Sequence, residues 1–576
     1  MVMFESVMSR AVMSRAVMSR AVTSETAVTT ATFARVLRAL ARGGVAARAL
    51  LVTVLGASLA NAVENDAANE LRYELRATRE ETRRATLAAH PDADASITGL
   101  LEYRLDGDFP PTEEDRYYRI LRLPLPAGVQ LEPGAIECLA DGRVAVATRI
   151  GDVFLVSNAF EEPPYRAEFR RFASGLHEVL GLAQRDGCLY VTQRGEVTRL
   201  RDVDGDDRAD RFDVVSDGWE ISGDYHEYAF GSEFDRDGHI WVVLCLTGSF
   251  SSQVPFRGWC VKVSEDGVMT PVASGIRSPG GIGPNAAGDM FYTDNQGPWN
   301  GTSILRHLAP GAFMGHPDGN RWYDLAPNMG PRPRDPKSGG RWHEELAKIP
   351  ELMNPAVFFP YQKMGQSASG VCCDRSDGRF GPFREQLFVG DQTHSTVMRV
   401  FLEKVKGRYQ GACFPFRKGF GSGIVPIEQA PDGSLFAGGT ARGWGARGGQ
   451  PFSLERLVWT GKVPFEVHEM RVRPDGFELS FTEAVDPAIA ADPSTYRLGT
   501  YTYIYQANYG SPEVDHTTPA IRAATVAADG RTVRLHVDGL EIGHVHELAM
   551  PALRSTARAP LVHPIAYYTL FYLPAE

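Results

Sequence analysis

The sequence predicts an all-β protein in which a six-bladed β-propeller is followed by an immunoglobulin-like β-sandwich. A phrase of two short apolar strands joined by a turn recurs with a period near 50 residues, which is typical of propeller blades. Glycine and proline, at 58 and 37 of 576 residues, favour many turns over a helical bundle. The last ~110 residues alternate apolar and polar positions without this phrase, which favours a separate β-domain.

Composition and charge exclude several classes of protein. With 43% hydrophobic and 23% charged residues, the chain is globular rather than disordered. The formal net charge of −11 argues against nucleic acid or an anionic membrane as the main partner, because both need clustered lysine and arginine. The seven cysteines are few and include no Cys-x-x-Cys pair, which excludes a disulfide scaffold, a zinc ribbon and covalently attached haem.

Residues 1–62 have the features of an export signal rather than of a folded domain. VMSRA occurs three times in residues 7–21, which indicates a mis-called or repetitive extension ahead of the signal. An arginine-flanked apolar run over residues 49–60 then ends in Ala-Asn-Ala, the pattern of a secretory signal peptide. We expect cleavage after Ala62 and an exported protein, periplasmic or extracellular. The run is shorter than the ~20 residues that span a bilayer, so no integral membrane span is expected in the mature chain; an uncleaved anchor is the alternative.

An arginine- and glutamate-rich stretch, residues 63–117, is predicted as a helical or irregular lead-in to a propeller at residues 118–463. Six copies of the recurring phrase begin near positions 135, 180, 230, 280, 370 and 423. The turn glycines of the first four copies are spaced 45, 51 and 50 residues apart; they are Gly142, Gly187, Gly238 and Gly288. Each supplies the positive φ that a tight hairpin turn requires. A β-sandwich of regular hairpins is the alternative, which the near-constant period disfavours.

Two further segments depart from the repeat. Residues 312–366 are rich in glycine, proline and arginine and lack strand alternation, so a long loop over one propeller face is expected. Residues 464–576 contain alternating strands such as GFELSFTEAVDP and RTVRLHVDGL, which predict the immunoglobulin-like sandwich. A structural or adhesive role is the default expectation for that sandwich.

The acidic segment DVDGDDRADRFD has the spacing of a calcium-binding loop. The Arg208 carbonyl takes position 7, and Asp207 stands at the position that is normally glycine. Five carboxylates take loop positions 1, 3, 5, 9 and 12: Asp202, Asp204, Asp206, Asp210 and Asp213. Because so many carboxylates repel one another without a cation, we predict calcium binding with a structural role, and a solvated acidic turn is the alternative.

Three phrases in the repeat carry a family resemblance. They are HEYAFGSEFDRDGHIWV at 226, GIRSPGGIGPNAAGDMFYTDNQGPW at 275 and LRHLAPGAFMGHP at 305. They resemble the glucose/sorbosone dehydrogenase-like family of pyrroloquinoline quinone (PQQ)-dependent sugar dehydrogenases, in particular the propeller portion of large exported planctomycete-type proteins. The resemblance covers about residues 118–460. It implies oxidation of a sugar or polyol hydroxyl with PQQ and calcium, and transfer of electrons to a separate carrier such as an external cytochrome.

The resemblance also implies roles for particular residues. His226 falls on the base that takes the hydroxyl proton of the sugar, and an imidazole with a pKa near neutrality suits that task. Arg277 falls on a cofactor-contacting arginine. The segment of Gln296, Gly297 and Pro298 is expected to lie at the cofactor and to offer backbone carbonyls to calcium, a hard cation that accepts oxygen ligands.

Several positions depart from the family pattern. Ser278 follows the turn arginine where asparagine is usual, and Thr393 and His394 stand where a lysine is expected. Gly423 and Val425 replace two expected arginines. Because PQQ is a tricarboxylate, the loss of three cations removes much of the charge pairing that would hold it.

These departures keep a second hypothesis open, that of a non-catalytic propeller that binds a carbohydrate or a protein ligand in the same cavity. Arg442 or Arg447, in the glycine-rich loop TARGWGARGG, would be the substitutes for the missing cations. In a sugar-binding propeller we expect Trp299 to serve as a stacking wall.

Overall fold

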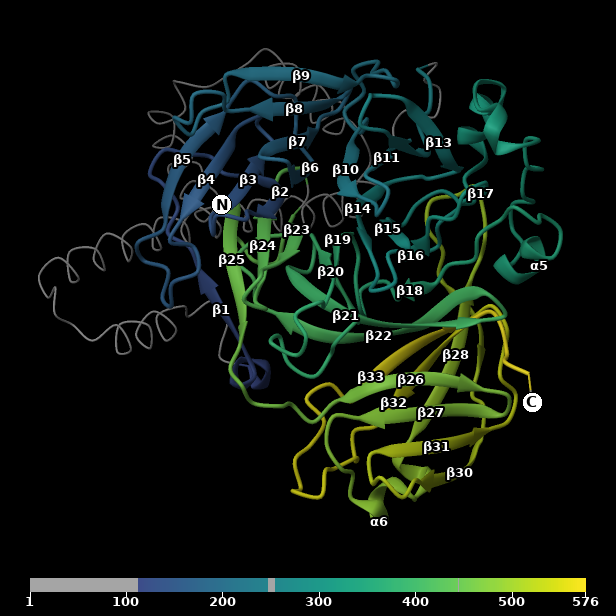
Figure 1. The fold of residues 1–576 in the computed structure, drawn as a ribbon. Helices are drawn as coiled ribbons and strands as arrows, with labels where there is room; N and C mark the ends of the chain where they lie inside the picture. Colours follow the sequence, from purple (N-terminus) through teal and green to yellow (C-terminus); the bar gives the residue numbers. More distant parts are fainter. Residues whose placement is uncertain (1–111, 247–253, 444, 576) are drawn as a thin grey trace, which may run out of the picture. The chain divides into compact units, whose positions relative to one another are not determined.

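The computed structural model of the protein describes residues 112–246, 254–443 and 445–575 (Figure 1). The export signal and most of the lead-in, residues 1–111, lie outside these ranges. In the part of the chain that the structure describes, no helix is both long enough and apolar enough to cross a membrane. All seven cysteines are free thiols, including the adjacent Cys372 and Cys373.

Six four-stranded antiparallel blades form the propeller, and Figure 1 labels most of their strands. Blade 1 consists of β2 (Pro133–Cys138), β3 (Val144–Thr148), β4 (Val153–Ser157) and β5 (Glu168–Ala173). Blade 2 consists of β6 (Gly181–Arg185), β7 (Cys188–Thr192), β8 (Val197–Arg201) and β9 (Arg211–Ser216). Blade 3 consists of β10 (Ala229–Phe234), β11 (Ile240–Leu244), β12 (Trp259–Val263) and β13 (Met269–Ser274).

The remaining blades follow the same order. Blade 4 consists of β14 (Pro279–Pro284), β15 (Met290–Asp294), β16 (Ser303–His307) and β18 (Val357–Phe359). Blade 5 consists of β19 (Ala368–Cys373), β20 (Leu387–Asp391), β21 (Thr396–Val405) and β22 (Arg408–Lys418). Blade 6 consists of β23 (Ile424–Gln429), β24 (Leu435–Thr440), β25 (Phe452–Trp459) and β1 (Tyr118–Arg122), which follows the short 3-10 helix η3 (Glu113–Arg116).

The blades close into a ring. The first strand of each blade contacts the first strands of its two neighbours, in the order β2, β6, β10, β14, β19, β23 and back to β2. Strand β1, from the N-terminal side, pairs antiparallel with β25 and completes blade 6. The ring is therefore closed by hydrogen bonds between the two ends of the propeller segment, as in other propellers that protect their strand edges.

The recurring phrase forms the two inner strands of every blade. Its turn glycines adopt left-handed φ values of +86°, +73°, +84° and +85° at positions 142, 187, 238 and 288, as the hairpin turns require. The second strands β3, β11 and β15 are buried along their whole length. The all-β fold class with a six-bladed propeller is confirmed.

Residues 312–366 differ from the long loop that the sequence predicts. They contain β17 (Ala312–Phe313), 3-10 helices η4 (Pro317–Leu325) and η5 (Pro327–Met329), helix α5 (Trp342–Leu346) and β18. Strand β18 pairs with β16 and supplies the outer strand of blade 4. This strand has three residues, all buried, so it is too short to show alternation in the sequence.

The C-terminal segment forms two sheets, as a sandwich requires. One sheet contains β26 (Val467–Arg473), β27 (Gly476–Phe481), β31 (Thr532–Val537) and β30 (Ile521–Val526). The other contains β33 (Ile565–Leu570), β32 (His544–Ala549), β28 (Arg497–Tyr503) and β29 (Glu513–Thr517). Two short helices, α6 (Pro487–Ala490) and η6 (Pro493–Thr495), precede β28.

The sandwich is not separate from the propeller. Strand β33 pairs with β22 of blade 5, so the second sheet and blade 5 form one eight-stranded sheet. Phe401 and Phe414 of blade 5 belong to the same buried cluster as the sandwich core. The sandwich therefore shares a sheet and a hydrophobic core with the propeller.

Candidate functional site

The strand register gathers six pairs of loops at one end of the ring. In each blade the beginning of the first strand pairs with the end of the second, as Pro279 does with Asp294 in blade 4 and Ala368 with Asp391 in blade 5. The loop before each first strand therefore lies beside the turn after each second strand. We call these loops the rim. His226 precedes β10, Arg277 precedes β14 and Gln296 follows β15, so all three lie on the rim.

Arg277 is held by its own blade. The buried Asp294 accepts hydrogen bonds from the backbone N–H groups of Arg277 (3.1 Å) and Ser278 (2.7 Å). The Arg277 guanidinium, in a residue that is 5% exposed, donates to the backbone carbonyl of Gln296 at 2.6 Å. Gly297 leaves room for this packing, because a methyl group built on it would lie 2.0 Å from Arg277 Cζ. Arg277 and the Gln296 segment thus fix each other.

His226 lies half-buried in the loop before β10. Its backbone N–H donates to the Asp224 carboxylate at 2.9 Å, and the same carboxylate oxygen lies 3.9 Å from His226 Nδ1. Burial lowers the pKa of His226; Asp224 opposes this shift, and the positive charges of Arg277 and Arg194 add to it. The imidazole is therefore neutral at pH 7 and able to accept a proton.

Tyr225 extends from blade 3 across the rim. Its ring packs edge-on against His226 with centroids 5.0 Å apart, and the residue is 46% exposed. Its hydroxyl approaches the turn after β24 in blade 6, where a methyl group on Gly443 would lie 2.5 Å from it. Because blades 3 and 6 occupy opposite places in the ring, Tyr225 spans the rim and presents an aromatic surface there.

Three other rim arginines have carboxylate partners of their own. Arg149 pairs with the buried Glu178 at 2.7 Å, and Arg194 lies 3.6 Å from the same residue. Arg442 pairs with the buried Glu132 at 3.0 Å. These cations are compensated within the chain, which lowers their attraction for an anionic ligand.

The backbone carbonyls of Gln296 and Gly297, which the resemblance places at a calcium ion, also accept hydrogen bonds from protein groups. The Gly297 carbonyl accepts hydrogen bonds from the N–H groups of Asn300 (3.0 Å) and Gly510 (3.1 Å), and the Gln296 carbonyl accepts from Arg277. Pro298 forms an isolated β-bridge with Tyr509 of the sandwich. The three residues of Gln296, Gly297 and Pro298 therefore lie together, as the resemblance implies, but their contacts are to protein groups.

Trp299 does not form the stacking wall that we expected. It is 8% exposed, and its ring packs against the buried Tyr505 with centroids 5.1 Å apart. The reason is that residues 505–511 of the sandwich cover this tryptophan, whose backbone N–H donates to the Gln506 carbonyl (2.7 Å). The sequence around Trp299, an aromatic residue after Gly-Pro, does not indicate that a distant segment buries it.

The surroundings of Gly423 differ from those of Thr393 and His394, the positions where the family has cations. Gly423 has no room for a side chain, because a methyl group there would lie 2.3 Å from the Gln392 carbonyl oxygen. Arg447 donates its backbone N–H to the Thr393 carbonyl at 3.0 Å. Burial lowers the pKa of His394; the Asp391 carboxylate opposes this shift and the Arg447 charge adds to it. Of the two suggested substitutes, Arg447 therefore lies near the position of the missing lysine.

Sequence reasoning missed two residues beside Arg277. His316 is 3% exposed, and burial together with the charges of Arg277 and Arg321 lowers its pKa to about 3. The phrase that contains His316, LRHLAPGAFMGHP, contributes to the family resemblance, but the resemblance assigned no role to this histidine. Tyr509, from the sandwich, is 66% exposed, and its ring centre lies 5.3 Å from Arg277 Cζ. No pattern in the sequence links positions so far apart.

The acidic loop lies between β8 and β9, within blade 2. Carboxylate oxygens of Asp202, Asp204 and Asp210 all lie within 4.8 Å of one another. Asp206 and Asp213 are outside this group, and Asp213 pairs instead with Arg201 of β8 at 2.7 Å. The structure therefore brings three of the five predicted ligands together.

Asp207 adopts the left-handed φ of +63° that its glycine-like position in this loop predicts. Its carboxylate pairs with Arg143 at 2.8 Å, so this extra negative charge has a cation beside it.

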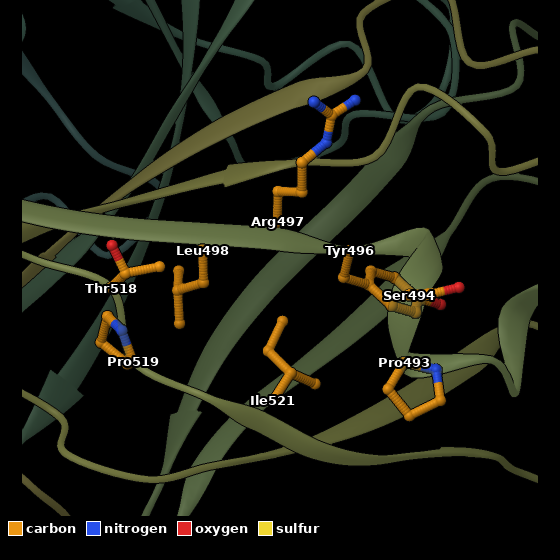
Figure 2. A pocket seen from close by; sticks show the side chains of 8 residues that line it. All are labelled: Pro493, Ser494, Tyr496, Arg497, Leu498, Thr518, Pro519 and Ile521. Carbon is orange, nitrogen blue, oxygen red and sulfur yellow. The ribbon is translucent and has the colours of Figure 1, made fainter.

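A pocket with a volume of about 400 Å³ lies on the sandwich, away from the rim residues (Figure 2). It is lined by Pro493, Ser494, Tyr496, Arg497, Leu498, Thr518, Pro519 and Ile521. Among these lining residues, Arg497 alone is charged. The lining does not bring together an acid, a base and a nucleophile, so it offers no catalytic arrangement.

The fold and the rim define a closed six-bladed propeller with an integrated sandwich. Residues 167–436 match a family model described as a domain of unknown function (DUF7133). No curated protein sequence matches the chain.

Solved structures similar to this chain include an oxidoreductase described as glucose dehydrogenase from Thermus thermophilus (20% identity, 59% of this chain and 100% of that chain, TM-score 0.43). A PQQ-bound aldose sugar dehydrogenase from Streptomyces coelicolor matches at 15% identity over 61% and 100% of the two chains, with a TM-score of 0.43. The PQQ domain of pyranose dehydrogenase from Coprinopsis cinerea matches at 12% identity over 60% and 98%, with a TM-score of 0.42.

Proposed function

We propose that this dehydrogenase-like propeller binds a sugar or polyol at the rim. The observation that carries the proposal is the pair of exposed aromatic rings beside polar groups: Tyr225 packs against His226, and Tyr509 lies over Arg277. Sugars present both apolar C–H faces and hydroxyl groups, so an aromatic face next to hydrogen-bonding groups is the chemistry that recognises them.

The rim residues, with the contacts they make in this structure, do not fit a PQQ–calcium pair. The Gln296 carbonyl accepts from the Arg277 guanidinium, and the Gly297 carbonyl accepts two N–H groups. Arg149 and Arg442 are paired with buried carboxylates, and Gly423 has no room for an arginine. A tricarboxylate with a calcium ion would have to break several of these contacts, so the arrangement favours a neutral polyhydroxyl ligand.

Calorimetric titration of the purified protein with glucose, galactose, xylose and sorbitol tests the binding proposal. We expect saturable binding of at least one of them. Tyr225→Ala should weaken it roughly two- to tenfold, because it removes an aromatic face, whereas Tyr225→Phe keeps the ring and should bind nearly as the wild type does. Equal affinities for the wild type and Tyr225→Ala would contradict the proposed place of the ligand.

Oxidation of the bound hydroxyl is a second candidate function, and the state of His226 favours it. A half-buried, neutral imidazole next to Asp224 is suited to remove a hydroxyl proton. If the protein oxidises sugars, electrons would pass to a separate carrier such as a cytochrome. His226→Ala should then lower kcat by ~10²-fold or more, and Arg277→Ala should instead weaken cofactor affinity. Dye reduction driven by sugar, measured with PQQ and calcium added, separates these two defects.

A further inference from the structure

One loop of the sandwich lies on the rim. Residues 506–510, which follow the buried Tyr505, are held by blade 4 on one side: the N–H of Trp299 donates to the Gln506 carbonyl (2.7 Å) and the N–H of Gly510 donates to the Gly297 carbonyl (3.1 Å). The N–H of Ser511 continues this contact with the Gly301 carbonyl (3.0 Å). We call residues 506–510 the sandwich loop.

The sandwich loop is held on its other side by the insertion of blade 4. Tyr505 accepts a backbone hydrogen bond from Gly339 (2.9 Å) and donates one to Gly340 (3.0 Å), and the N–H of Ala507 donates to Ser338 Oγ (2.9 Å). The Tyr505 ring lies against Trp342 with centroids 4.0 Å apart. Contacts on both sides fix the position of the loop relative to the rim.

The tip of the sandwich loop reaches Arg277. The Tyr509 ring lies over the guanidinium, which also donates to the carbonyls of Asn295 (3.3 Å) and Gln296 (2.6 Å). A cation over an aromatic face is attracted by the ring, and the attraction fixes the plane of the guanidinium. Trp299, in the same turn, adopts a left-handed φ of +64°, which costs a bulky residue free energy and persists only where surrounding contacts enforce it.

We propose that the sandwich loop is part of the rim site, and that Tyr509 is a positioning residue that orients Arg277 for ligand. The inference deepens the proposed function and rests on it for the identity of the ligand. It gives the C-terminal sandwich a role in recognition, because one of its residues forms a wall of the propeller's site. Tyr509 is 66% exposed, so its ring is not required to fill a core.

Three variants test the inference. Tyr509→Ala removes the ring, Tyr509→Phe keeps it, and Val268→Ala changes another exposed apolar side chain in a turn of blade 3. We expect all three to unfold at nearly the wild-type temperature, because the substituted side chains are largely exposed. In titrations with the four sugars and polyols, Tyr509→Ala should weaken binding roughly two- to fivefold, and the other two variants should not.

A second readout does not need a ligand. The charges that act on His226 include those of Arg277, Arg194 and Asp224. If Tyr509 orients Arg277, its removal lets the guanidinium move, and the titration midpoint of His226 should rise by a few tenths of a pH unit in Tyr509→Ala and stay unchanged in Tyr509→Phe. Nuclear magnetic resonance of labelled histidine, with the His226 signal assigned from its loss in His226→Gln, measures this midpoint.

The two readouts separate the two proposals. If none of the four compounds binds the wild type, the proposed function fails, while the His226 titration still decides the role of Tyr509. An unchanged His226 midpoint in Tyr509→Ala would overturn the positioning role, and so would equal sugar affinities in wild type and Tyr509→Ala. A shift in Tyr509→Ala that Tyr509→Phe does not show supports it.

Discussion

Three glutamates on the inner strands carry strongly perturbed carboxyl groups. They are Glu137 on β2, Glu233 on β10 and Glu428 on β23. Burial raises the pKa of Glu137 to about 8 and that of Glu233 to about 7. Burial and the charges of the other two glutamates raise the pKa of Glu428 well above its usual range, and Arg375 opposes this shift. The inner strands therefore contain three carboxyl groups whose burial and mutual repulsion oppose the ionisation of all three.

These glutamates should make the fold less stable at alkaline pH. A folded-state pKa above the unfolded value of 4.5 gives stability that is present below pH 4.5 and lost as the pH rises through about 7–8. Glu428→Gln keeps the shape and removes the charge, so we expect it to melt a few °C above the wild type at pH 8 and close to it at pH 5. Thermal unfolding at both values measures this. Exposed Glu265→Gln is the control, and equal wild-type and Glu428→Gln melting temperatures at pH 8 would contradict the prediction.

His563 lies between two carboxylates at the junction of propeller and sandwich. Its ring nitrogens lie 2.6 Å from Glu466 and 3.0 Å from Glu114, and Glu114 is also 3.3 Å from Arg417 of blade 5. Burial lowers the pKa of His563, but the two carboxylates outweigh it and raise the pKa to about 9. The resulting stability is fully present below pH 6.5 and is lost as the pH rises through about 9.

We expect His563→Gln to lower the free energy of unfolding by about 2–4 kcal/mol at pH 7, because it removes the cation between two buried carboxylates, of which Glu466 loses its ion pair while Glu114 keeps Arg417. The loss should shrink towards pH ~10, where the wild-type histidine is itself neutral. Denaturant unfolding measures both values, with exposed His516→Gln as the control. If His563→Gln unfolds as the wild type does at pH 7, the ion pairs contribute nothing to stability.

At the scale of elements, the recurring phrase predicts the inner strands because their burial depends on local alternation and on turn glycines. The outer strands are less visible: β18 has three residues, and β1 comes from before the first phrase. The site follows the same rule. His226, Arg277 and Gln296 could be placed on one rim because antiparallel register brings their loops together, whereas Trp299 could not be predicted as buried because its cover comes from the sandwich.

The loop between β8 and β9 allows a direct test of the calcium prediction. We expect calcium to raise the melting temperature, since a ligand that binds only the folded state stabilises it by ~2.7 kcal/mol at a hundredfold excess over Kd. Asp204→Asn should abolish the calcium response because Asp204 belongs to the group of three close carboxylates. Asp213→Asn should keep it, because Asp213 pairs with Arg201. A wild-type melting temperature that is insensitive to chelation would leave only an acidic turn.

At the scale of the whole molecule, the sandwich and the propeller should unfold as one unit. They share the eight-stranded sheet through the pairing of β22 with β33, and they share a buried core. We therefore expect a single calorimetric transition for the chain, and the same midpoint by intrinsic fluorescence and by circular dichroism. Two resolved transitions would contradict this, because they would require the shared sheet to break while one part stays folded.

The shared sheet also explains what sequence reasoning could not reach. Alternation and turn residues indicate the strands of each domain, but the pairing of β22 with β33 depends on contacts between residues distant in the chain. The contact between Tyr509 and Arg277 is a consequence of that pairing and of the sandwich loop. Fold class was therefore predictable from local patterns, and the composition of the rim was predictable only in its propeller part.

We infer that the rim binds a polyhydroxyl ligand while Arg149, Arg442 and the carbonyls of Gln296 and Gly297 keep their contacts with protein groups. Side-by-side calorimetric titration of the wild type with PQQ in the presence of calcium, and with the four sugars and polyols, is the decisive experiment. We predict saturable sugar or polyol binding that Tyr225→Ala weakens, and no PQQ binding at roughly tens of micromolar. Calcium-dependent, stoichiometric PQQ binding accompanied by sugar-driven dye reduction would overturn this inference and establish a dehydrogenase instead.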